Sequence, residues 1–172
     1  PYKRVDLMLR AMAKLRDRFP SAELLVIGRG AARRELEALA KELGLGERTR
    51  FTGFVSDRER DTLLASCRAS VCASPKEGWG LTVIESNALG TPVVATDAPG
   101  LRDSVRHGET GLLAPYADVP AFSAALARLL EQDAFALKMR RAAIEWSKRF
   151  DWERAADEME SAIEQALATE RR

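Results

Sequence analysis

Short apolar runs alternate with amphipathic helical segments along most of this chain. The first clear run, Leu24-Leu25-Val26-Ile27, has the continuous apolar character of a strand that is buried on both faces. Further strand-like runs occur at 50–55, 69–73, 92–96 and 111–113, and helical periodicity occurs at 5–19, 36–43, 57–64 and 81–89. Such alternation requires a mostly parallel sheet with helices on both faces, because right-handed crossovers place each helix against the sheet. The sequence therefore predicts an α/β, doubly wound, Rossmann-like fold.

The C-terminal part has a purely helical pattern, with apolar residues at helical spacing in 122–130, 135–146 and 152–167. A length of 172 residues fits a single domain. Lys and Arg number 27 against 26 Asp and Glu, so the net charge of +1 does not indicate a nucleic-acid partner. No apolar run reaches the roughly 18 residues of a membrane span, and we expect a soluble, cytoplasmic protein with Cys67 and Cys72 as reduced core thiols.

A tryptophan framed by two glycines lies between two glutamates in residues 77–85. The glycines let the backbone approach a ligand closely, and Leu81 or Thr82 begins a helix whose open N–H groups favour a phosphate. Glu85 is one turn into that helix, and its side chain points back toward the same end. Glu77 and Glu85 are therefore predicted to bind hydroxyls on either side of a phosphate.

Other motifs carry weaker signals. Gly28-Arg29-Gly30 begins like a dinucleotide-binding fingerprint, but Arg33 stands at the third glycine position. Both a plain tight turn and a phosphate-proximal turn stay open for this segment. His107 is the only histidine and lies in a polar loop, so a Ser-His-Asp triad is not indicated.

Several segments together resemble the retaining GT-B glycosyltransferases of glycosyltransferase family 4, also described as glycosyl transferases group 1. The region from Ser74 to Glu85, followed by residues 90–96, is similar to the E-x7-E signature region of that family. Residues 2–6 resemble its lysine-containing start of the first helix, although Arg4 replaces a usual glycine. Residues 51–55 resemble its F-x-G-x-V strand, and residues 107–113 resemble its D-G-x-T-G-x-L turn.

The resemblance implies the nucleotide-sugar-binding, C-terminal half of a GT-B enzyme that transfers a sugar with retention. Glu77 would hold hydroxyls of the donor sugar, Glu85 the ribose hydroxyls, and Lys3 would supply a cation to the diphosphate. The diphosphate would bind the backbone of Gly78, Trp79, Gly80, Leu81 and Thr82, and the nucleobase would lie between loops at Gly28, Arg29, Phe54 and Val55. Neither a metal nor a cofactor is expected, because the helix dipole and cationic side chains would stabilise the leaving diphosphate.

The resemblance also implies that the 172 residues are a fragment that is inactive alone. Family members have a further strand, in the middle of the sheet, before the position of Tyr2-Lys3, and an N-terminal domain that binds the acceptor. A longer parent chain could then lie peripherally at the inner membrane face. Pro99, Gly100 and Asp103 replace the usual paired glycines and glutamate of a sugar-contacting loop.

Three alternatives remain open at this point. One is a non-catalytic module that binds nucleotides or carbohydrate, and another is a nucleotide-sugar epimerase of related fold. A third is a glycoside hydrolase, which would need Glu77 and Glu85 about 5–10 Å apart across an open sugar cleft.

Overall fold

The computed structural model describes residues 2–170 and confirms the α/β fold, since every strand pair of the described residues is parallel. The elements follow in the order α1 (Val5–Leu15), β1 (Leu24–Ile27), α2 (Arg33–Glu42), a 3-10 turn (Gly46–Arg48), β2 (Thr49–Gly53), α3 (Asp57–Ser66), β3 (Ser70–Cys72), α4 (Leu81–Ala88), β4 (Val93–Thr96), α5 (Leu101–Ser104), β5 (Gly111–Ala114), α6 (Val119–Glu131), α7 (Asp133–Ser147) and α8 (Trp152–Glu170). The helical C-terminal end is confirmed as well.

Local signals in the sequence place several of these boundaries. Ser56 precedes α3, and its side chain accepts a hydrogen bond from the Glu59 amide at 3.3 Å, which satisfies one of the open N–H groups of the first turn. Asp118 caps α6 in the same way through the Ala121 amide at 2.9 Å. Gly44 ends α2 in the left-handed region, with φ of 70°.

The helix α5 was not predicted. No helix or strand was predicted between the strand-like runs at 92–96 and 111–113. In the structure Leu101–Ser104 forms a single helical turn, in which the Asp103 carboxylate accepts from the Gly100 amide at 3.2 Å. A four-residue helix is too short to show a hydrophobic period, so its sequence carries no helical pattern.

The strands form two sheets rather than one. β1 pairs with β2, and β3 pairs with β4, which pairs with β5. Among the described residues, β1 and β3 are therefore edge strands with one side unpaired. A cavity of about 710 Å³ is lined by all residues of β1 and all residues of β3, so it lies between the two open edges.

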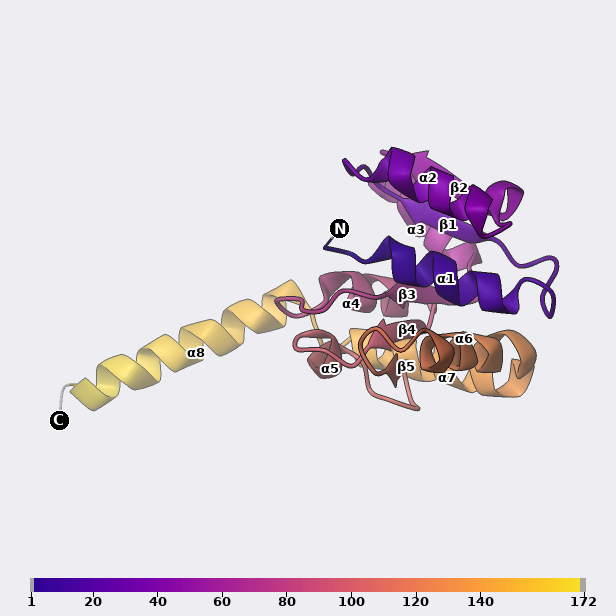
Figure 1. The fold of residues 1–172 in the computed structure, drawn as a ribbon. Helices are drawn as coiled ribbons and strands as arrows, with labels where there is room; N and C mark the ends of the chain where they lie inside the picture. Colours follow the sequence, from indigo (N-terminus) through magenta and orange to yellow (C-terminus); the bar gives the residue numbers. More distant parts are fainter. Residues whose placement is uncertain (1, 171–172) are drawn as a thin grey trace.

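Helices cover both sides of the strands and join the two sheets (Figure 1). α1 packs against α2 and α6, and α6 also packs against β4 and β5, whereas α4 packs against α3, α5 and α7. One buried apolar cluster contains Leu9 of α1, Leu24 of β1, Val94 of β4 and Leu129 of α6. The core is thus continuous through the helices even though the sheet is divided.

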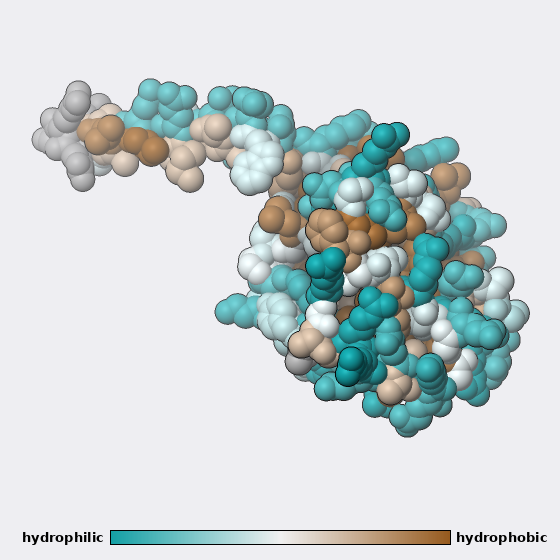
Figure 2. All heavy atoms as spheres, turned by 90° about the horizontal axis from the view of Figure 1, so that it is seen from above, coloured by the Kyte–Doolittle hydropathy of each residue, from teal (hydrophilic) through white to brown (hydrophobic). Residues whose placement is uncertain are grey.

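The last helix, α8, extends away from the rest of the molecule (Figure 1). Its residues 152–169 are all exposed, including Trp152, Met159, Ile163 and Leu167. Figure 2 shows apolar residues gathered along one side of α8 and hydrophilic residues along the other. None of the helices within residues 2–170 combines the length and apolar character that crossing a membrane requires.

Replacing Asn87 with leucine is expected to stabilise the fold. Asn87 of α4 is fully buried, and its amide oxygen and nitrogen form no hydrogen bond with another described residue. A buried polar group without a partner costs about 1–3 kcal/mol, and leucine keeps the branched shape of asparagine with the same number of side-chain heavy atoms. Urea denaturation of Asn87→Leu should therefore show a free energy of unfolding that is higher by about 1–3 kcal/mol. Asn87→Ala is the control, because it removes the same amide but leaves a void. A lower free energy of unfolding for Asn87→Leu would show that the amide is hydrogen-bonded in solution.

Candidate functional site

The glycine-rich loop between β3 and α4 has a backbone that only glycine accommodates at Gly80. Gly80 precedes α4 with φ of 86°, in the left-handed region, and a Cβ atom there would lie 2.6 Å from the Ser104 Oγ atom of α5. By contrast, a Cβ atom on Gly78 would meet nothing within 4 Å. Gly80 is thus required by the turn and by its contact with α5, whereas Gly78 leaves open space beside the backbone.

The amides of this loop and of the first turn of α4 are open. Among the described residues, no hydrogen bond is donated by the amides from Gly78 to Thr82, and the first bonded one is Val83, which donates to the Gly80 carbonyl at 2.9 Å. Leu81 and Thr82 are exposed. Successive open amides at a helix N-terminus attract anions, because their N–H dipoles converge there and the helix dipole adds to them.

Lys3 and Glu77 lie directly beside these amides and contact each other. The Lys3 Nζ atom is 2.6 Å from Glu77 Oε1. The Glu77 side chain is only 14% exposed, while that of Lys3 is 57% exposed. Burial works to raise the pKa of Glu77, but hydrogen bonds from Lys3 and Ser74 outweigh it, so the pKa lies below its ordinary value. Glu77 is therefore ionised at neutral pH, next to a cation that is accessible to a ligand.

Removing the cation should have a small, pH-dependent effect on stability. Because the pKa of Glu77 is lowered by folding, its contribution is present above its unfolded pKa of about 4.3 and is lost as pH falls through the folded value. Lys3 is largely exposed, so Lys3→Met should lower the free energy of unfolding by less than about 1 kcal/mol at pH 7. Urea denaturation at decreasing pH should show the difference from the unsubstituted chain shrinking below about pH 4. Lys148→Met, in an exposed pair with Glu145, is the control. A Lys3→Met difference that is constant with pH would show that the ion pair with Glu77 is not its cause.

Glu85 is exposed and lines the 710 Å³ cavity together with Lys3 and Thr82. Arg60 of α3 lines the same cavity. The hydrogen bond to Asp61 is the main cause that raises the pKa of Arg60, and the nearby charge of Glu85 adds to it. Sequence reasoning missed this arginine, because nothing in the pattern of α3 distinguishes it from the other charged residues of that helix.

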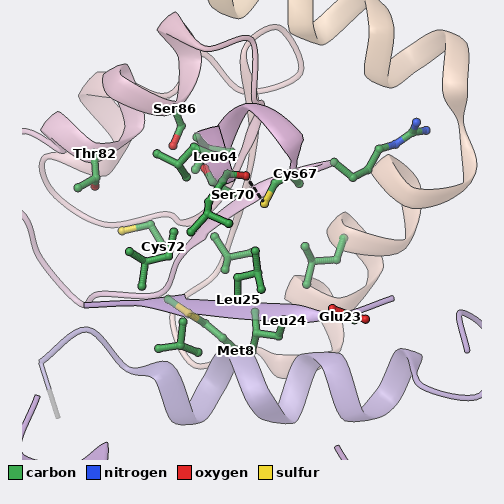
Figure 3. Close-up of a pocket in the computed structure, with 18 of the residues that line it drawn as sticks. Met8, Glu23, Leu24, Leu25, Leu64, Cys67, Ser70, Cys72, Thr82 and Ser86 are labelled. Atoms are coloured by element: carbon green, nitrogen blue, oxygen red, sulfur yellow. Dashed lines mark hydrogen bonds between the residues drawn. The ribbon is translucent and has the colours of Figure 1, made fainter. Parts of the chain in front are cut away.

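Most of the cavity is apolar. Figure 3 shows Met8 of α1, Leu24 and Leu25 of β1, and Ser70 and Cys72 of β3 around it, with Thr82 and Ser86 of α4 to one side. Glu77 and the glycines of the loop do not line it. Of the predicted site residues, only Lys3, Thr82 and Glu85 line the cavity.

The two loops predicted to flank a nucleobase meet each other. The Gly28 amide donates to the Gly53 carbonyl at 2.9 Å, and the Arg29 guanidinium lies over the ring of Phe54 at 5.4 Å from its centroid. The Phe54 ring is 73% exposed, and Val55 follows it. None of these residues lines the cavity. They form a separate exposed aromatic surface, and their predicted role stays a prediction.

Trp79 was predicted to contribute to the ligand site through its backbone. In the structure its side chain is half-buried and packs edge-on against Phe150, with ring centroids 4.5 Å apart. The ring therefore lies against the connection between α7 and α8. Sequence reasoning gave no signal for this contact, because the two residues are far apart along the chain.

The cysteines are free, as predicted: Cys67 is half-buried and Cys72 is buried. Burial raises the pKa of both thiols. Both line the cavity. Within residues 2–170, no group of three or more His, Cys, Asp or Glu side chains is placed to hold a metal ion.

The family described as Glycosyl transferases group 1 matches residues 1–150. The chain belongs to this family, which confirms the resemblance seen in the sequence. It is 35% identical to the D-inositol 3-phosphate glycosyltransferase of Corynebacterium glutamicum (strain R), an alignment that covers 99% of this chain and 42% of the relative. It is 33% identical to the phosphatidyl-myo-inositol mannosyltransferase of Mycobacterium leprae, over 92% of this chain and 42% of the relative.

Solved structures show the same fold. Sucrose-phosphate synthase from Thermosynechococcus elongatus superposes with a TM-score of 0.87 at 32% identity, over 98% of this chain and 43% of that one. HepE of Anabaena, crystallised with UDP, superposes with a TM-score of 0.87 at 24% identity, over 96% of this chain and 46% of that one. This chain thus spans less than half the length of these relatives.

Proposed function

We propose that this chain is the nucleotide-sugar-binding half of a retaining glycosyltransferase. The observation that carries the proposal is the run of open amides from Gly78 to Thr82, with the exposed cation of Lys3 beside it and a carboxylate at each end. A diphosphate with a sugar on either side has the matching chemistry, because it offers anionic oxygens to the amides and hydroxyls to the carboxylates. The UDP bound to the similarly folded HepE supports a nucleoside diphosphate as the ligand.

In this proposal Glu85 accepts hydrogen bonds from the ribose hydroxyls and Glu77 accepts them from the donor sugar. Ionised carboxylates make such bonds about 1.5–3 kcal/mol strong. Arg29 and Phe54 flank the nucleobase, since their stacked guanidinium and exposed ring offer a flat surface for it.

The same groups act on the leaving diphosphate during transfer. As the bond between the sugar and the diphosphate breaks, negative charge grows on the diphosphate oxygens. In this proposal Lys3 and the unbonded amides from Gly78 to Thr82 donate to those oxygens, and preorganised donors stabilise such charge without further rearrangement. Glu77 holds Lys3 at 2.6 Å and so fixes the cation between sugar and diphosphate.

We further propose that the polypeptide carrying the acceptor-binding half also supplies a strand to the cavity between β1 and β3. Lys3, two residues before α1, contacts Glu77 beyond the end of β3, so α1 starts at the edge where the parallel strands end. A strand that leads into α1 from this edge must run parallel to β1 and β3. With α1 and β1 it forms a right-handed β-α-β unit, the usual connection in such sheets. The apolar lining from α1, β1 and β3 fits a strand buried on both faces.

Calorimetric titration of the chain with UDP, GDP and ADP tests the donor-binding role. We expect saturable binding of at least one of the three nucleotides. If none of them binds, the open amides do not serve a nucleoside diphosphate and the proposal is wrong. A non-catalytic module would bind a nucleotide too, so transfer activity of a chain that contains both halves, lost on Glu77→Gln, separates these two functions.

A further inference from the structure

Three aromatic rings connect the glycine-rich loop to the end of α7. The Trp79 and Phe150 rings are 4.5 Å apart at 63°, and the Phe150 and Trp146 rings are 4.9 Å apart at 81°. Both pairs have the edge-to-face geometry that aromatic rings favour. Phe150 thus forms the bridge between a side chain in the loop and a side chain on α7.

Trp146 also reaches the loop by a second route. Its Nε1–H group donates to the Ser104 carbonyl at 2.9 Å, and Ser104 packs so closely on Gly80 that a Cβ atom there would lie 2.6 Å from its Oγ. The guanidinium groups of Arg106 and Arg149 lie over the Trp146 ring, at 5.2 and 5.5 Å from its centroid. The position of Trp146 is therefore fixed by contacts on several sides.

The conformation of the loop depends on such side-chain contacts, because its own backbone forms few hydrogen bonds. The Glu77 amide donates to the Pro99 carbonyl at 3.0 Å, but the five following amides make no hydrogen bond within residues 2–170. Two of those five residues are glycines, which lose the most conformational freedom when they are ordered. Contacts of Trp79 and Gly80 with neighbouring elements are what hold the amides in place.

We propose that Phe150 and Trp146 are positioning residues that hold the loop from Gly78 to Gly80 in the conformation that presents its amides to the donor diphosphate. This inference rests on the proposed donor-binding function and extends it to the end of α7, outside the loop. Preorganisation of a loop strengthens binding because the ligand does not have to order it. The nucleotide affinity should therefore depend on a side chain that never touches the nucleotide.

Calorimetric titration of UDP into Phe150→Ala tests the inference. We expect the dissociation constant to rise by about fivefold to twentyfold. This corresponds to about 1–1.8 kcal/mol, the free energy that nucleotide binding must then supply to order the loop. Phe150→Tyr keeps the ring and should bind within about twofold of the unsubstituted chain. Leu137→Ala, at an exposed position on α7, is the control and should bind unchanged. The Glu77 and Val83 amides flank the loop and donate to the Pro99 and Gly80 carbonyls. Without nucleotide, their hydrogen exchange should be faster in Phe150→Ala and unchanged in the two other variants.

The outcomes separate this inference from the proposed function. If Phe150→Ala melts at a lower temperature but binds UDP as tightly as the unsubstituted chain, the rings serve packing only and the inference is overturned, while the donor-binding role stands. Unchanged hydrogen exchange of the Glu77 and Val83 amides in Phe150→Ala would overturn it as well. If the unsubstituted chain binds none of UDP, GDP and ADP, the proposed function fails and this inference fails with it.

Discussion

Glu85→Ala is expected to weaken UDP binding by about tenfold to a hundredfold, if Glu85 holds the ribose. The carboxylate is exposed, lies one turn into α4 and faces the cavity beside Thr82 and Lys3. Its alanine substitute loses charge-assisted hydrogen bonds of about 1.5–3 kcal/mol, which corresponds to this range of affinities. Because the side chain is exposed, the fold should melt at nearly the same temperature.

The measurement is calorimetric titration of UDP into both proteins at the same salt concentration. Glu164→Ala is the matched control, because Glu164 is exposed on α8 and far from the loop (Figure 1). Affinity that is equal in Glu85→Ala and the unsubstituted chain would remove Glu85 from the ribose role. A loss that also appears in Glu164→Ala would point to a general effect of negative charge rather than to a specific contact.

Attaching a strand to the N-terminus is expected to stabilise the chain by roughly 3 kcal/mol or more, from about six buried β-branched residues less their ordering entropy. The extension would carry six alternating valines and isoleucines and two glycines before Pro1, so that it can enter the cavity between β1 and β3. At this size, 3 kcal/mol corresponds to a rise in melting temperature of about 6–12 °C. Scanning calorimetry provides this measurement.

Cys67 and Cys72 provide a second, local measurement of strand insertion. Both thiols line the cavity, and burial raises the pKa of each, so they are labelled with iodoacetamide at mildly alkaline pH, where more thiolate is present. A strand in the cavity should slow labelling at least about tenfold, because the reagent reacts only when the site opens. The control extension carries aspartate at its two central positions and should neither stabilise nor protect. Equal labelling and melting for both extensions would show that the cavity does not accept a strand.

The sequence predicted the elements better than their pairing. β1 was placed at Leu24–Ile27 from its apolar run alone, and α4 at Leu81 from the change of pattern after Gly80. The separation of β1 from β3 was not visible, because strand order depends on contacts between segments that are distant in sequence. The resemblance suggested a further central strand, and the open edges of β1 and β3 lie where such a strand would pair.

The sequence predicted individual features of the site but not the contacts between residues that are distant in sequence. Open amides at the start of α4 follow from the helix boundary, so sequence reasoning could place them. The ion pair of Lys3 with Glu77 joins a residue before α1 to a residue after β3. These residues are far apart in sequence, so only the folded structure shows that they pair. The same holds for Arg60 beside Glu85 and for Phe150 against Trp79.

The two unpaired strand edges also bear on solubility. β1 consists of Leu24, Leu25, Val26 and Ile27, and β3 of Ser70, Val71 and Cys72, so neither carries a charge or a proline. Natural edge strands often carry charged residues or prolines, which prevent them from pairing with strands of other molecules. A strand bound between them would therefore protect newly synthesised chains from aggregation, in addition to completing the sheet.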